Sequence, residues 1–413
     1  MHELVTLPNG LRIVHEHMDS VRSAAVGVWV GVGSRFESPG ENGSAHFIEH
    51  MLFKGTAAHT AGELADIMDA IGGQCDAYTT RETTCFYARV LDTHLDTAID
   101  LLGEMFFDSR FDEADVASER GVVFEEIDMY DDTPEDLVSE RLFLRSFPGA
   151  LGRPILGTKR TLRAMTGASL RDFMVRHYTP DRVVVSLCGS YTDLHLARIA
   201  ARFSALETRK SPPFRPAAYT QSFTLKRKAT EQNHLCLGFP GLAGNDGRRF
   251  ALHVLNSILG GGMSSRLFQS VREKHGLCYS VYSFTASHLD AGIFGVATAL
   301  ARENELKALG LILDEIARLR DKGVTAEELS RAAEQAKSGM ILALESTSAR
   351  MNRLGSAYTA LGMCLTPDEV IARYDAVTRD DVLALARELL EPDKASFSAV
   401  GRLADGETYR TAL

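Results

Sequence analysis

The sequence predicts an α+β protein with two homologous domains, each a largely antiparallel sheet packed with helices. Three observations support this class. Strand-like and helix-like patterns are interspersed along the 413 residues without the regular alternation of a doubly wound sheet. Residues 204–220 contain three prolines and no hydrophobic period, which indicates a linker. Segments before and after it repeat one another. We therefore expect domains at 1–205 and 221–413, joined by a linker at 206–220.

The repeat is defined by three pairs of segments: 46–55 with 251–260, 72–75 with 275–278, and 112–115 with 325–328. The shifts between partners are 205, 203 and 213 residues. Short insertions explain this narrow spread, so we interpret the second half as a degenerate copy of the first.

Individual elements can be assigned within the first copy. Residues 23–30 alternate small with apolar side chains, and 83–90 are rich in β-branched and aromatic ones, which favours strands. Thr60 and Glu63 form the pattern of a capping box, so a helix is expected from there to Gly72. Further helices are expected near 94–107, 113–130 and 166–177.

The overall composition excludes several classes of protein. The formal net charge is −10 and there is no basic block, so we expect no nucleic-acid partner. No apolar run approaches the roughly 18–20 residues that span a bilayer, and the first residues lack a signal or transit pattern. The six cysteines include no Cys-x-x-Cys pair, which is typical of reduced thiols. We therefore expect a cytoplasmic protein without a membrane span.

The segment His46-x-x-Glu49-His50 carries the clearest chemical signal. Residues four apart lie on the same face of a helix, so both imidazoles can reach one metal ion. Glu49 lies close enough to contact a metal-bound water without being a ligand. The alternative is a helix with two partly exposed histidines beside a glutamate.

A catalytic zinc ion needs a third protein ligand and an open fourth position. Residues 119–130 form an acidic helical segment in which Glu119 and Glu126, seven apart, share one face while Glu125 points elsewhere. That face could present one carboxylate to the metal and hold a second behind it. The alternative is a solvated acidic helix.

This constellation, with Glu126 lying 76 positions after His50, resembles the inverted-zincin metallopeptidases of the pitrilysin/insulysin type. Five further segments carry the resemblance: 31–37, 43–45, 53–56, 77–79 and 119–123. Together they are similar to the catalytic β subunit of mitochondrial processing peptidase and its bacterial relatives. The similarity covers nearly the whole chain and implies two domains that form half of a clam-shell chamber.

The resemblance implies a role for each residue. His46, His50 and Glu126 would bind Zn²⁺, Glu49 would act as general base, and Glu119 would support the site. Zinc would polarise the scissile carbonyl and lower the pKa of its water to about 7, while Glu49 moves the proton. The expected activity is that of a zinc metalloendopeptidase, acting on unfolded peptides or presequence-like segments.

The second repeat keeps none of these ligands. The repeat shifts place the positions of His46, Glu49, His50, Glu119 and Glu126 on Ala251, Val254, Leu255, Ala332 and Gly339. We therefore expect one zinc ion per chain.

The second repeat has its own pair, Arg272 and Tyr279. The resemblance implies that Arg272 grips the peptide carbonyl and Tyr279 stabilises the oxyanion opposite the zinc. The alternative is a surface cation and a packed strand residue. Because one chain carries both this pair and the zinc motif, we expect a homodimer in which the pair acts in trans.

Residues 73–79 resemble the edge strand on which the family lays its substrate. Asp76, Ala77, Tyr78 and Thr79 would then bind the peptide by main-chain hydrogen bonds. The alternative is a strand that pairs only within its own sheet. Asp76 departs from the family, whose members usually have Asn there, and places a charge beside the cleft.

Two alternative functions are compatible with the sequence. The chain could be a non-catalytic structural subunit, like the core proteins of respiratory complexes that share this fold, or the catalytic subunit of a heterodimer with a metal-free partner. The complete His46-to-His50 motif and Glu126 favour the peptidase.

Overall fold

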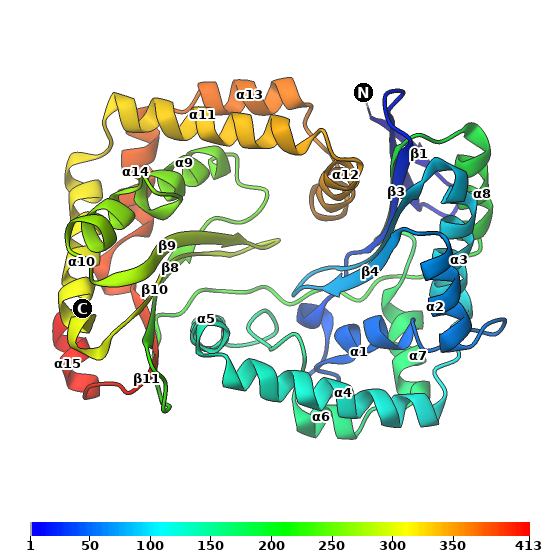
Figure 1. Cartoon of the computed structure of the whole chain (residues 1–413), viewed down its shortest axis with the longest axis horizontal. Helices are drawn as coiled ribbons and strands as arrows, with labels where there is room; N and C mark the ends of the chain where they lie inside the picture. Colours follow the sequence, from blue (N-terminus) through cyan, green and yellow to red (C-terminus); the bar gives the residue numbers. More distant parts are fainter. Residues whose placement is uncertain (1) are drawn as a thin grey trace. The chain divides into compact units, whose positions relative to one another are not determined.

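The computed structural model describes residues 2–413 and divides them into two compact units (Figure 1). The first unit contains the described chain up to Ile127, then Arg153–Arg215 and Ile341–Thr366; the second contains Asp128–Gly152, Pro216–Met340 and Pro367–Leu413. The units therefore depart from the contiguous ranges 1–205 and 221–413, because each half of the chain contributes one segment to the other unit. The predicted α+β class with two domains is confirmed.

The first unit is built on a six-stranded sheet in the order β1-β2-β6-β3-β5-β4. Its strands are β1 (Glu3–Thr6), β2 (Arg12–His17), β3 (Ser23–Val30), β4 (Gln74–Thr79), β5 (Thr84–Leu91) and β6 (Val183–Gly189). The β2–β6 pair is parallel and the other pairs are antiparallel. The sheet is thus mixed, and β4 forms one of its edges.

The second unit has a five-stranded sheet in the order β7-β11-β8-β10-β9. Its strands are β7 (Phe223–Arg227), β8 (Asn233–Gly241), β9 (Cys278–Ser287), β10 (Gly292–Leu300) and β11 (Ser396–Gly401). The β7–β11 pair is parallel and the others are antiparallel. Without β1, the first sheet matches this order and these directions strand for strand, as a duplicated domain requires. The edge strands β4 and β9 correspond.

Helices of the first unit bury one side of its sheet. They are α1 (Ser44–Met51), α2 (Ala61–Ala70), α3 (Leu95–Asp108), the first part of α4 (Glu113–Asp132), α6 (Lys159–Arg163), α7 (Gly167–His177) and α8 (Asp193–Phe203). The capping box predicted before α2 is present, since Thr60 and Glu63 bond reciprocally. Phe47, Leu102 and Phe173 from three of these helices pack with Val26 and Val28 of β3 in one large core.

The other face of the first sheet is covered by α12 (Thr347–Leu361), a helix from the second half of the sequence. Its Met351 and Leu354 pack beside Trp29 in a second buried cluster. In the second unit, α5 (Pro134–Ser146) from the first half packs likewise against β8 and β11. These two helices account for the exchanged segments.

The remaining helices belong to the second unit: α9 (Arg249–Gly260), α10 (Glu305–Lys322), most of α11 (Ala326–Ala343), α13 (Pro367–Asp375), α14 (Arg379–Leu389) and α15 (Gly406–Ala412). A π-helical segment, Phe268–Lys274, precedes β9. No helix within residues 2–413 has the length and apolar character needed to cross a bilayer.

Gly355 of α12 provides a test of this packing. A Cβ atom there would lie 2.0 Å from Nε1 of Trp29, and this nitrogen is held in place by donating to Ser186 Oγ at 2.9 Å. We expect Gly355→Ala to lower the free energy of unfolding by about 1–3 kcal/mol, measured by thermal and urea denaturation. The matched control is Gly121→Ala in α4, where nothing lies within 4 Å and a gain of about 0.5–1 kcal/mol is expected. Equal stability of the two variants would contradict this packing.

Candidate metal centre

The helix that carries the motif, α1, begins at an unusual cap. Gly43 precedes it with φ of 102°, in the left-handed region, and a Cβ there would approach Leu156 O to 2.9 Å. The capping acceptor is Glu37, which lies outside the helix and six residues before Gly43. Its carboxylate accepts from the backbone N–H groups of Gly43 and Ala45, both at 2.8 Å. Asn42 Nδ2 donates to it at 2.9 Å. A fully buried acidic group therefore satisfies the first turn of α1 and its positive dipole end.

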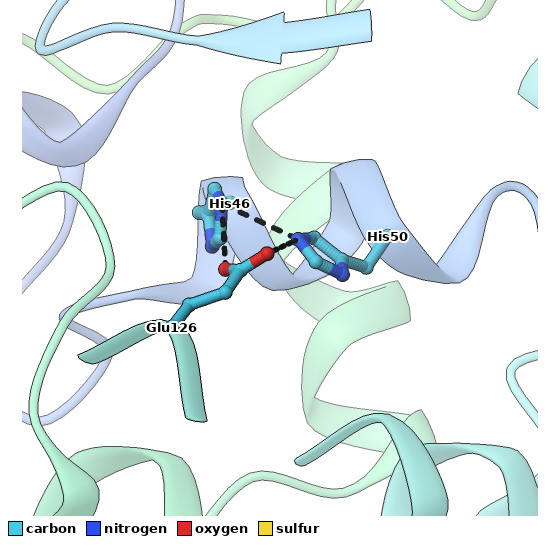
Figure 2. A group of neighbouring side chains, drawn as sticks. All are labelled: His46, His50 and Glu126. Atoms are coloured by element: carbon cyan, nitrogen blue, oxygen red, sulfur yellow. Dashed lines mark hydrogen bonds and ion pairs between the residues drawn. The ribbon is translucent and has the colours of Figure 1, made fainter. Parts of the chain in front are cut away.

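His46 and His50 project from the same face of α1, and Glu126 reaches them from α4 (Figure 2). The two Nε2 atoms lie 3.3 Å apart. Oε2 of Glu126 is 3.6 Å from Nε2 of His46, and its Oε1 is 3.6 Å from Nε2 of His50. In a tetrahedral zinc site with bonds of roughly 2.0–2.1 Å, two ligand atoms lie roughly 3.3 Å apart. The three donors therefore surround one point at the spacing that zinc needs.

The state of these donors also suits a cation. Burial and the nearby His50 lower the pKa of His46 to about 3, so its imidazole is neutral with a lone pair available. Oε2 of Glu126 is buried without a hydrogen-bond partner within residues 2–413. Burial, reinforced by Glu119, raises the pKa of Glu126 despite the opposing effect of His50. Burial alone would lower the pKa of His50, but the hydrogen bond to Glu119 and the charge of Glu126 raise it. A neutral His46, a His50 beside two carboxylates and one under-satisfied carboxylate oxygen form a donor set that fits a divalent ion with a fourth position left for water.

Glu119 lies seven residues before Glu126 on the same face of α4, and it fixes the orientation of His50. Nδ1 of His50 lies 2.8 Å from Oε1 of Glu119, so Nδ1 donates and Nε2 faces the other donors. Lys54 Nζ contacts the second oxygen, Oε2, at 2.7 Å. Burial alone would raise the pKa of Glu119, but the bonds from His50 and Lys54 outweigh it and lower the pKa. The structure thus brings Glu119 behind a histidine rather than into the three-donor group.

Glu49 points from α1 toward the edge strand β4. Its Oε2 accepts a hydrogen bond from Thr79 Oγ1 at 2.5 Å. Burial raises the pKa of Glu49, although the Thr79 bond opposes the shift. The carboxylate lies outside the group of three possible ligands, which is the position that a general base requires.

The four edge-strand residues all lie on β4, in different environments. Asp76 is exposed and its carboxylate accepts from the N–H of Ala77 at 2.8 Å. Tyr78 packs edge-on against Trp29 and Tyr87. Thr79 turns toward Glu49. Because β4 pairs within its sheet only with β5, its other edge has no strand beside it in that sheet.

Arg272 and Tyr279 meet in the second unit. Arg272 lies in the π-helical segment, with its guanidinium carbon 5.1 Å from the centre of the Tyr279 ring and 4.5 Å from that of Phe268. Tyr279 is 77% exposed, so it is not a packed strand residue. The pair is therefore an exposed cation–aromatic contact at the start of β9.

Sequence reasoning missed two residues of the zinc-site surroundings. Lys54 follows His50 by four positions, and this helical spacing could have indicated that it shares the face of the motif. No helical spacing indicates the role of Glu37. It precedes Gly43 by six residues, and the loop between them brings its carboxylate to the start of α1.

The cap predicts a pH dependence of stability. Burial outweighs the three hydrogen bonds and raises the pKa of Glu37 to about 7, above its unfolded value. The folded state therefore binds the proton more tightly, so this contribution is full below pH about 4.5 and is lost as pH rises through 7. Between pH 4.5 and 8 we expect wild type to lose about 3 kcal/mol of stability relative to Glu37→Gln, whose side chain does not titrate, measured by urea denaturation. A difference that does not change with pH would contradict this assignment.

Comparisons with known proteins show which family the chain belongs to. Residues 12–159 match the family model described as "Insulinase (Peptidase family M16)", and residues 164–336 match "Peptidase M16 inactive domain". The chain is 45% identical over 394 residues to the uncharacterized zinc protease YmxG of Bacillus subtilis, covering 94% of this chain and 96% of that protein. It is 44% identical to an uncharacterized zinc protease of Streptomyces coelicolor, covering 98% and 90%.

The fold recurs in solved structures of lower identity. A protease from Helicobacter pylori superposes with a TM-score of 0.90 at 23% identity, covering 97% of this chain and 99% of that one. A chain of complex III from Candida albicans superposes with a TM-score of 0.86 at 19% identity, covering 99% of each. The family models and the close relatives extend over most of the sequence. The chain belongs to peptidase family M16, the insulinase family.

Proposed function

We propose that the protein is a zinc-dependent metalloendopeptidase that cleaves unfolded peptides or presequence-like segments. The observation that carries the proposal is the convergence of three donors from two helices, with the histidine nitrogens 3.3 Å apart and Glu126 beside both. The names of the bacterial relatives, which call them zinc proteases, support zinc as the ion. We place the protein in the cytoplasm, where its six unpaired cysteines would stay reduced.

Each residue of the proposed zinc site has a separate role. Zinc, when bound by His46, His50 and Glu126, supplies Lewis acidity that polarises the carbonyl and lowers the pKa of a water to about 7. Glu49 takes a proton from the attacking water at a carboxylate oxygen and delivers it to the leaving amine. Glu119 holds His50 in the tautomer that leaves Nε2 free to bind the metal.

The peptide is held by main-chain pairing along β4. The edge of this strand that faces away from β5 offers N–H and C=O groups to an extended chain, in the segment from Asp76 to Thr79. Recognition through the main chain is largely independent of sequence, which suits unfolded substrates. Arg272 would grip a peptide carbonyl and Tyr279 would stabilise the oxyanion, roles supported by the exposure of the tyrosine.

A second candidate is a non-catalytic structural subunit. It is favoured by the model named "inactive domain" over residues 164–336 and by the similarity of fold to a chain of complex III. The complete set of three donors and Glu49 in the first unit favours the enzyme, since a structural subunit has no need of two histidines and a carboxylate converging on one point. A catalytic subunit with a metal-free partner would keep the same zinc site.

Metal analysis combined with peptide cleavage tests the enzyme. We expect Glu49→Gln to keep one zinc per chain while cleavage of a quenched peptide falls about 10²–10⁴-fold, the usual contribution of a general base. Glu126→Gln should lose zinc and activity together, because it removes a ligand. The matched control is Glu125→Gln on the exposed side of α4, which should retain both. Wild-type protein that neither retains zinc nor shows chelator-sensitive cleavage would contradict the proposal.

We further propose that the active form is a homodimer in which Arg272 and Tyr279 serve the zinc site of the partner subunit. Mixing Glu49→Gln chains with Arg272→Ala chains should then create sites with both parts intact. Random exchange between symmetric dimers predicts recovery of roughly one quarter of wild-type activity. Mixing Glu49→Gln with Glu126→Gln is the control and should recover none, because both changes affect the same site. Absence of recovery in the first mixture would rule out action in trans.

A further inference from the structure

A single hydroxyl group connects the general base to the substrate strand. Thr79 Oγ1 donates to Oε2 of Glu49 at 2.5 Å. Within residues 2–413, no other group donates a hydrogen bond to this carboxylate. Hydrogen bonds to an ionised acceptor are short and about twice as strong as neutral ones. The orientation of Glu49 therefore depends on this one donor.

The donor itself is firmly held. Thr79 is the last residue of β4 and lies directly opposite Thr84 of β5. The two hydroxyl oxygens are 3.3 Å apart, and the fully buried Thr84 donates its own proton to Val32 O at 3.0 Å. The position of the Thr79 hydroxyl is thus fixed by the sheet rather than by a mobile loop.

Glu49 needs such a restraint. Its side chain has several rotatable bonds, so a carboxylate without a hydrogen-bond donor would sample several orientations. A donor on Oε2 fixes one oxygen and leaves the other to receive a proton, and such alignment is what proton transfer requires.

We propose that Thr79 is a positioning residue for Glu49, and that through it the strand that binds the peptide also aligns the base. This inference rests on the proposed peptidase function. It assigns Thr79 a task beyond main-chain pairing with substrate: its side chain acts on the chemical step, and its backbone on binding. Because β4 also contacts α1, which carries Glu49, the alignment does not depend on the second unit.

The test separates kcat from KM. Thr79→Val removes the hydroxyl and keeps the shape, and it should lower kcat about tenfold, as loss of one charged hydrogen bond predicts. KM should change less than about twofold and zinc content should stay at wild-type level. Thr79→Ser keeps the hydroxyl and should restore kcat. Thr79→Ala replaces the valine variant if valine folds poorly. Crystal structures of the variants should show Glu49 displaced only where the hydroxyl is missing.

Several outcomes would overturn the inference. A rise in KM with kcat unchanged would make Thr79 a substrate-binding residue only, and a serine variant as impaired as valine would make its role one of packing. An unmoved Glu49 in the valine variant would show that the carboxylate needs no donor. Each of these leaves the peptidase proposal intact. Wild-type protein without chelator-sensitive cleavage would instead overturn the proposed function, and this inference with it.

Discussion

The first unit holds two imidazole nitrogens 3.3 Å apart with a carboxylate oxygen 3.6 Å from each of them, and the candidate site depends on this close approach. Burial and the neighbouring His50 lower the pKa of His46 to about 3, so the two rings are not both protonated at this spacing. Several neighbours keep the cluster assembled. Glu37 anchors the start of α1, and Glu119 and Lys54 form an ion pair that locks His50 from behind. The arrangement of the three donors is thus maintained by contacts near both ends of one short helix.

Duplication explains why the two units share a framework although only one of them carries the three-donor group among the described residues. Both sheets share one strand order, so the second unit inherited the same framework. The repeat shift places Ala251 and Leu255 of α9 at the positions of the two histidines, and both are buried apolar side chains. The half-buried Arg272 and the exposed Tyr279 are the polar features that we assign to substrate.

The spacing of residues in the sequence predicted the local features of this protein, such as single helices, strands and caps. The capping box at Thr60 and the strand over 23–30 are confirmed by the structure. His46 and His50, four residues apart, lie together with Glu126 in a group that could hold a metal ion. The seven-residue interval of Glu119 and Glu126 placed two carboxylates on one face without distinguishing them. The family resemblance assigned Glu126 to the metal, and the structure places Glu126 beside both histidines and Glu119 behind His50. The sequence did not predict that α5 packs in the second unit and α12 in the first, because an apolar helix face does not specify which of two similar sheets it covers. Glu37 was missed for a related reason, since its partners are defined by a loop.

X-ray absorption at the zinc edge of the purified, zinc-loaded protein tests most directly whether His46, His50 and Glu126 bind zinc. The method reports the atoms bound to the ion without reference to any substrate. A four-coordinate site is predicted, with two imidazole nitrogens, one carboxylate oxygen and one water oxygen at roughly 2.0–2.1 Å. Sulfur scattering at roughly 2.3 Å, or an all-oxygen shell without imidazole, would contradict the assignment of His46, His50 and Glu126.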